Sequence, residues 1–144
     1  MKLYRFVRFD EIFNLKQNRK LIATKSARRF GNVNTVKADR NTNGIFFSVK
    51  KQKGYYHFMM DTCLNHYLLE IEIPDNDERI IEECMGIYDD YENFDYDPDD
   101  PDRPRVYLPE VVVKEYSLND VVRILDMNKV IKKITNHGCG YITF

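Results

Sequence analysis

The sequence predicts a single α+β domain spanning residues 1–144. Its length is typical of one domain, and 43% hydrophobic with 13% aromatic residues is enough to bury a core. The predicted strands and helices follow one another irregularly and do not alternate as in a βαβ array. This order favours an α+β arrangement over a parallel α/β sheet.

The first elements are a strand and a short helix. Residues 3–7 are rich in aromatic and β-branched side chains, which predicts a strand. Asp10 is a suitable N-cap for a helix that turns Ile12 and Leu15 inward. A short strand is predicted over residues 21–23 after the helix ends.

The next segment is predicted to contain a long loop, a buried strand and a helix. Residues 24–44 are basic and rich in asparagine and glycine, which indicates a long loop. Residues 45–49 form a short apolar run typical of a buried strand. Within residues 50–65 the apolar side chains fall close to helical spacing, so a helix is predicted there.

The middle of the chain is predicted to alternate between strands and an acidic helix. Residues 67–73 alternate apolar and polar side chains up to Pro74, as a half-buried strand does. Residues 78–91 are predicted as an acidic helix. Residues 106–113 are predicted as a strand in which Pro109 lies at an edge or a bulge.

Turn chemistry predicts the remaining segments. Residues 89–105 are rich in aspartate, proline and tyrosine, so they are predicted as an acidic loop. Ser117 is a good N-cap for a short helix reaching Leu125. A last strand is predicted near the end of residues 129–144.

Charge is strongly segregated although the net charge is only −1. Residues 1–60 hold fourteen Lys/Arg and three Asp/Glu, whereas residues 61–110 hold three Lys/Arg and seventeen Asp/Glu. These regions either neutralise each other on solvated faces or bind partners. In the second case the basic region binds an anion such as phosphate or nucleic acid. The acidic region is then a repelling rim, a partner site or a nucleic-acid mimic.

Several classes of protein are disfavoured. The three cysteines form no CxxC pair and the three histidines are scattered, so neither a disulfide framework nor a metal site is expected. The chain begins without a signal-peptide pattern and has no membrane-length apolar window. A cytoplasmic protein without membrane contact is therefore expected.

One set of residues, spread along the chain, has the order expected of a catalytic site. A first strand bears Arg5, a middle strand ends at Ser48, Tyr55 and Tyr56 follow, and a late strand begins near Glu110. This order resembles the Arg–Ser–Glu arrangement of the ADP-ribosyltransferase superfamily, most closely its small bacterial and phage branch with DNA-modifying, toxin-like members. The resemblance implies split antiparallel sheets with short flanking helices.

The resemblance also implies roles for these residues. Arg5 would contact the phosphates of NAD, and Ser48 would support the nicotinamide ribose and the catalytic acid. Glu110 would stabilise the positive charge that develops on the ribose as nicotinamide leaves. Tyr55 or Tyr56 would stack on the nicotinamide.

The resemblance also bears on which group would accept ADP-ribose and on the role of the basic loop. Glu115 lies five residues after Glu110, so the Glu-x-Glu pair of arginine-directed members is absent. A nucleic-acid base or another protein side chain is therefore the expected acceptor. Arg28 and Arg29 would hold the NAD phosphates or the acceptor. No metal is expected.

An alternative hypothesis needs no catalysis. Residues 75–102 would bind a basic, nucleic-acid-handling protein, as small phage-encoded inhibitors in host defence or counter-defence do. Both hypotheses fit one scaffold, because fold does not determine function.

Overall fold

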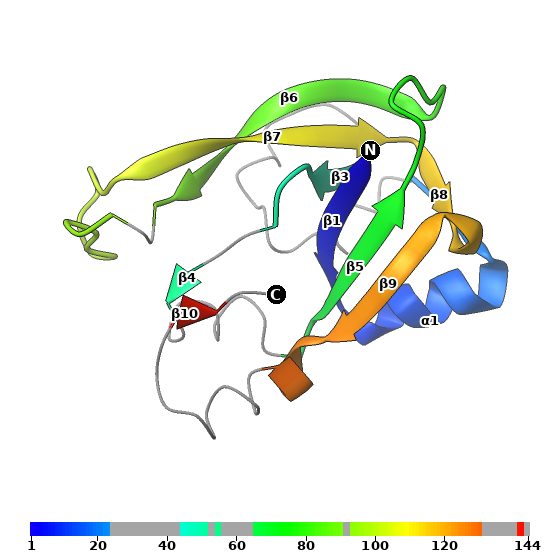
Figure 1. The fold of residues 1–144 in the computed structure, drawn as a ribbon, viewed down its shortest axis with the longest axis horizontal. Helices are drawn as coiled ribbons and strands as arrows, with labels where there is room; N and C mark the ends of the chain where they lie inside the picture. Colours follow the sequence, from blue (N-terminus) through cyan, green and yellow to red (C-terminus); the bar gives the residue numbers. More distant parts are fainter. Residues whose placement is uncertain (24–43, 52–53, 56–64, 91–92, 131–140, 143–144) are drawn as a thin grey trace.

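The computed structural model describes residues 1–23, 44–51, 54–55, 65–90, 93–130 and 141–142. A six-stranded sheet with the order β6-β7-β3-β1-β5-β9 dominates it, and every neighbouring pair in this sheet is antiparallel (Figure 1). The strands are β1 (Lys2–Val7), β3 (Ile45–Ser48), β5 (Tyr67–Glu72), β6 (Ile80–Asp89), β7 (Arg105–Val113) and β9 (Val121–Asp126).

Shorter elements complete the fold. The pairs β2 (Lys20–Ile22) with β8 (Glu115–Ser117) and β4 (Gly54–Tyr55) with β10 (Tyr141–Ile142) form two small antiparallel ladders. The helical elements include α1 (Phe9–Asn18) and the 3-10 turn η3 (Leu118–Asp120), and the described residues 127–130 are also helical. Few short helices with a mostly antiparallel sheet confirm the predicted α+β class.

The start of the chain largely follows the sequence pattern. The strands predicted over residues 3–7 and 21–23 are β1 and β2, and Ile12 and Leu15 of α1 are buried as predicted. The N-cap prediction is wrong, because Arg8 is the N-cap and Asp10 lies inside the first turn. From there the Asp10 carboxylate accepts a hydrogen bond of 3.0 Å from the Glu11 backbone N–H, which suits an acidic residue at a helix N-terminus.

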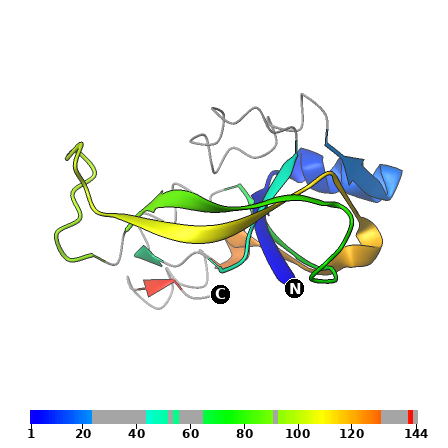
Figure 2. The ribbon, with the colours of Figure 1, turned by 90° about the horizontal axis from the view of Figure 1, so that it is seen from above.

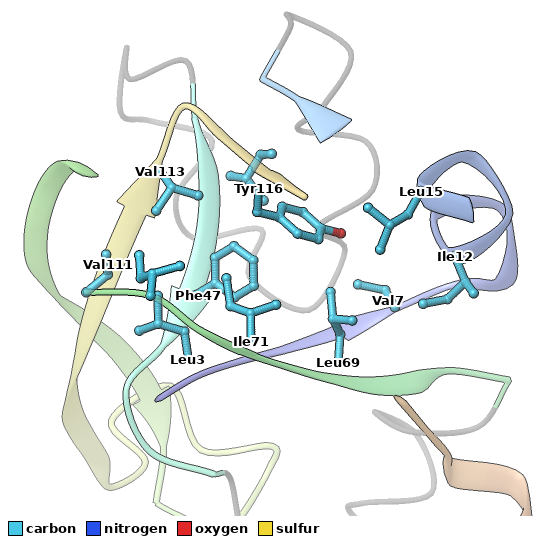
Figure 3. Packing of buried hydrophobic residues seen from close by; sticks show 12 residues of the cluster. Leu3, Val7, Ile12, Leu15, Phe47, Leu69, Ile71, Val111, Val113 and Tyr116 are labelled. Atoms are coloured by element: carbon cyan, nitrogen blue, oxygen red, sulfur yellow. The ribbon is translucent and has the colours of Figure 1, made fainter. Parts of the chain in front are cut away.

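The core lies between one face of the sheet and α1 (Figures 2 and 3). Phe47 packs edge-on against Tyr116, with ring centroids 5.3 Å apart. These rings connect β3 to β8 and fill the space beneath the helix. Strands β1, β5 and β7 supply aliphatic side chains to the same face: Leu3, Val7, Leu69, Ile71, Val111 and Val113.

The acidic helix predicted over residues 78–91 is wrong. Nine residues of β6 pair with β7, so Ile80–Asp89 form a strand, while residue 91 lies outside the described residues (Figure 1). Its apolar residues match a helical spacing, but Ile81, Met85 and Ile87 also match the two-residue period of a strand. Pairing with β7, which local pattern does not reveal, decided between the two periods.

Two further helix predictions are also corrected. Gly54 and Tyr55 of the predicted helix 50–65 form β4, and residues 52–53 and 56–64 lie outside the described residues. Ser117 is the N-cap of η3, as predicted, but η3 ends at Asp120 and β9 follows. The basic loop, apart from Gly44, also lies outside the described residues.

Pro109 lies in β7, an interior strand of the sheet, immediately beyond Glu110, where the pairing of β7 with β3 ends. It pairs with Met85, and its carbonyl accepts a 3.1 Å hydrogen bond from the Val49 N–H on the β3 side. In a strand the nitrogen and carbonyl of one residue point to the same side. The missing N–H therefore faces Val49, just beyond the end of β3, and not β6, so proline removes a bond at the end of the β3–β7 ladder and leaves the β6–β7 pairing uninterrupted.

Arg79 holds the base of the β6–β7 hairpin. Its guanidinium donates to Asp77 (Nη2–Oδ2 2.8 Å) and to Asp120 of η3 (Nη1–Oδ2 2.6 Å). Hydrogen bonds from the Arg79 side chain and backbone lower the pKa of Asp77 from 3.8 to about 2. Burial alone would raise the pKa of Asp120, but bonds from Arg79 and Ser117 lower it overall. The ion pairs attach the turn before β6 to the loop before β9.

Candidate functional site

Ser48 and Glu110 are direct cross-strand neighbours. Ser48 of β3 pairs with Glu110 of β7 on one side and with Tyr4 of β1 on the other, while Glu110 also pairs with Cys84 of β6. Directly paired residues project from the same face of an antiparallel sheet. Ser48 and Glu110 therefore share one face, opposite the core, and both are buried.

Arg5 projects from the other face of the sheet. It follows Tyr4 in β1 and pairs with the core residue Leu69, so strand alternation turns it away from Ser48 and Glu110. Of the three residues to which the resemblance assigns roles, the sheet therefore brings Ser48 and Glu110 together and places Arg5 on the opposite face.

The guanidinium of Arg5 is engaged inside the domain. It donates two hydrogen bonds to the Glu11 carboxylate, 3.0 Å from Nε and 3.2 Å from Nη2, and a third of 3.0 Å to the Phe46 carbonyl. Tyr116 donates a 2.9 Å hydrogen bond to the same carboxylate. Through these bonds Arg5 and Glu11 together join β1, α1, β3 and β8 inside the domain.

Electrostatics reinforce this structural role. Burial alone would lower the pKa of Arg5, but the charge and hydrogen bonds of Glu11 outweigh burial and raise it. Burial, and then the negative charge of Glu11, raise the pKa of the Tyr116 hydroxyl. Arg5 therefore stays charged and Tyr116 stays neutral at ordinary pH.

The other residues suggested by the resemblance either lie in another strand pair or fall outside the described residues. Tyr55 lies in β4, where it pairs with Tyr141 of β10. Tyr56, Arg28 and Arg29 lie outside the described residues.

The tip of the β6–β7 hairpin is the most acidic described part of the chain. A loop was predicted over residues 89–105, and the described residues 90 and 93–104 do form one, built of successive turns, while Asp89 and Arg105 belong to β6 and β7. The side chains of Asn93, Asp97 and Asp100 each accept the backbone N–H two residues later, at 2.9–3.0 Å. Such turns fix the backbone and leave charge in solvent. The exposed aspartates are Asp95, Asp97, Asp99, Asp100 and Asp102.

At the base of this tip, the negative charge of Asp89 is balanced by arginines of the same hairpin. Asp89, the last residue of β6, accepts hydrogen bonds from Arg103 Nε at 2.9 Å and the Tyr96 hydroxyl at 3.0 Å. Arg105 Nε lies 3.4 Å from the same carboxylate. These contacts anchor both ends of the loop to one side chain. Arg103 and Arg105 therefore both bind Asp89 at the base of the tip, and Arg103 Nη1 also donates a 3.4 Å hydrogen bond to the Asp100 carbonyl.

An apolar strip lies beside the acidic tip. Met85 and Ile87 of β6 and Tyr107 of β7 are 49%, 37% and 62% exposed, and Ile87 pairs directly with Tyr107. The strip continues the core-side face of the sheet into the part of the hairpin that projects beyond the other strands (Figure 1). Phe94, in the acidic loop, is fully exposed. Exposed apolar groups gathered near like charges are typical of protein-binding surfaces.

Sequence reasoning missed this strip because it predicted a helix over residues 78–91. The two-residue spacing of Met85 and Ile87 was the available signal, since a strand places both on one face, whereas a register shift between Ile80 and Glu82 interrupts the pattern before them.

Two other kinds of site were sought in the described part of the chain. Its side chains include no cluster of three or more potential metal ligands. None of its helices is long and apolar enough to cross a membrane.

Comparison of the chain with protein-family models, with curated proteins and with solved structures finds no match.

Proposed function

We propose that this protein is a non-enzymatic interaction module that binds a basic, nucleic-acid-handling protein through the tip of its β6–β7 hairpin. The observation that carries the proposal is the group of five exposed aspartates held by tight turns at the end of a projecting hairpin. Such a protein would compete with nucleic acid for a basic surface, as a small phage inhibitor in host defence or counter-defence does.

The charge balance supports this choice of partner. Residues 75–102 contain thirteen Asp/Glu and one Arg, a net charge of −12. The single Arg79 is occupied by Asp77 and Asp120, so it does not offset the aspartates at the tip. A single-sign field of this kind accelerates encounter with a basic surface and repels nucleic acid.

Order in the tip strengthens the argument. A disordered acidic tail would lose conformational entropy on binding, whereas turns at Asn93, Asp97 and Asp100 already hold the backbone. Phe94 adds an exposed ring of the kind that anchors protein interfaces. The tip thus combines charge that attracts a basic partner with an exposed aromatic ring that can anchor it.

The test replaces the five exposed tip aspartates with asparagine. Asparagine retains the turn-forming oxygen, so the loop keeps its backbone while losing its charge. Binding to a panel of purified basic nucleases, helicases and polymerases is measured against ionic strength. We expect about a twofold loss of affinity per removed charge and a weaker salt dependence, because exposed charge pairs contribute ~0.5 kcal/mol each.

A matched control neutralises exposed acids far from the tip, Asp10→Asn in α1 and Glu72→Gln in β5, and should leave binding unchanged. If no member of the panel binds, or if binding ignores the tip charges, the proposal is wrong.

The second candidate function is an NAD-dependent ADP-ribosyltransferase that releases nicotinamide and modifies a nucleic acid or protein. The adjacency of Ser48 and Glu110 favours it, since a Ser beside the catalytic Glu is part of the resemblance. The position of Arg5 and the burial of Glu110 make it the weaker candidate. Nicotinamide release from NAD, abolished by Glu110→Gln in a folded variant, would support it. No NAD binding or consumption with several acceptors offered would eliminate it.

A further inference from the structure

We infer that the outer edge of β6 accepts an extended, basic segment of the partner protein as an additional strand, whose apolar side chains contact Met85, Ile87 and Tyr107. This inference rests on the proposed function and specifies how the partner is held. It concerns a second surface, next to the acidic tip but distinct from it.

The position of β6 in the sheet is the first argument. β6 is the terminal strand in the order β6-β7-β3-β1-β5-β9, and no other described strand pairs with its outer side. At ten residues it is the longest strand described. A long edge strand presents a row of main-chain donors and acceptors that can pair with an added strand.

The apolar strip is the second argument. An added strand next to β6 places alternate side chains over the same face as Met85 and Ile87. That face is exposed here, because the projecting hairpin extends beyond α1 and the core (Figures 1 and 2). Tyr107 lies opposite Ile87 and extends the strip onto β7. The added strand would therefore bury apolar surface as well as satisfy main-chain groups.

The acidic residues near β6 determine what kind of strand can pair with it. Glu83 is exposed and shares a face with Met85 and Ile87, and the five tip aspartates follow β6. If a second copy of this chain paired along β6, these acidic side chains would lie close together and repel one another. Natural edge strands often use charged residues in this way to prevent self-pairing. A segment in which lysine or arginine alternates with apolar residues complements both the acids and the strip.

The test uses an octapeptide alternating lysine and valine as the probe, with its N-methylated form as a control that keeps the charge but loses the main-chain donors. Amide hydrogen exchange of the full-length protein is measured by NMR. We expect the peptide to slow exchange at every second amide of β6, those on its outer side, and the N-methylated form to have no effect.

Substitutions locate the surface. Met85→Lys and Ile87→Lys should each weaken peptide binding about tenfold, in the range of an interface anchor. The matched control is Val122→Lys, at an exposed apolar position of the opposite edge strand β9, which should bind the peptide as the unmodified protein does. All three positions are exposed, so their substitution should leave the fold intact.

The outcomes separate this inference from the proposed function. Binding that depends on the tip aspartates but leaves β6 exchange unchanged, or equal binding of the N-methylated peptide, overturns strand addition and leaves the acidic-tip proposal standing. Slowed β6 exchange that survives replacement of the tip aspartates supports strand addition and contradicts the tip as the main determinant. No change in β6 exchange at millimolar peptide overturns the inference.

Discussion

Replacing Glu11 with glutamine removes the charge that balances Arg5 inside the domain. The side chains of Arg5 and Glu11 are 6% and 2% exposed, and two hydrogen bonds join them. Glutamine has almost the volume of glutamate, so little cavity forms and the measured change reports the lost charge. Arg5 keeps its own charge, because Arg is not deprotonated in proteins.

The expected loss follows from burial. Removing one partner of a buried ion pair costs about 3–5 kcal/mol, because the other charge stays in the interior uncompensated. This is a large part of the ~5–15 kcal/mol by which domains are stable. At about 2–4 °C per kcal/mol for a chain near this size, the Tm should fall by roughly 10 °C.

Glu70→Gln is the matched control. Glu70 is also buried, but its partners Arg123 and Lys2 are 40% and 55% exposed and can regain water when the carboxylate is lost. We therefore expect a loss of about 1 kcal/mol or less. The same substitution at two buried glutamates thus differs mainly in the burial of the partner.

Urea denaturation followed by circular dichroism measures both variants, and similar m values would indicate that the midpoint reports stability. Adding Arg5→Met to Glu11→Gln should recover part of the loss, because the uncompensated charge is then absent. Equal losses for Glu11→Gln and Glu70→Gln, or no recovery in the double variant, would refute the assignment of Arg5 to a buried structural ion pair.

Three further predictions concern other parts of the fold. Hydrogen bonds from Arg79 depress the pKa of Asp77 in the folded state. The ionised Asp77 therefore stabilises the fold fully above pH 3.8, and this contribution to stability is lost as the pH falls toward about 2. Asp77→Asn should flatten the acid limb of a stability–pH curve, and an unchanged limb would contradict this. A Cβ on Gly44 would collide with the Val112 side chain, so Gly44→Ala should cost about 1–3 kcal/mol in urea denaturation; a neutral effect would refute the clash. Phe94 is fully exposed, so Phe94→Ala should change stability by less than about 0.5 kcal/mol, and a larger loss would show that the ring packs within the fold.

Local chemistry in the sequence was sufficient for several elements. The strand at β1 and the inward face of α1 follow from patterns within a few residues, and these are the patterns that the core preserves. The turns of the acidic loop follow from aspartate and proline, whose preferences act on their own backbone. The charge of residues 75–102 needed no structure at all.

Pairing over long distances decided the rest. Residues 78–91 fit both a helix and a strand, and only the ladder to β7, more than fifteen residues away, made β6 a strand. The same register determines which side chains meet. Ser48 and Glu110 were predicted to share a site and are neighbours, whereas Arg5 projects from the opposite face.

The sequence alone therefore determined the α+β class, the opening strand and helix, and the concentration of acidic residues, because each depends on composition or on neighbours along the chain. Tertiary structure decided the face of each strand residue, the burial of Arg5 against Glu11, and the exposure of the apolar strip beside the acidic tip. These depend on sheet register, and a shift of one residue would turn every side chain of a strand to the other face.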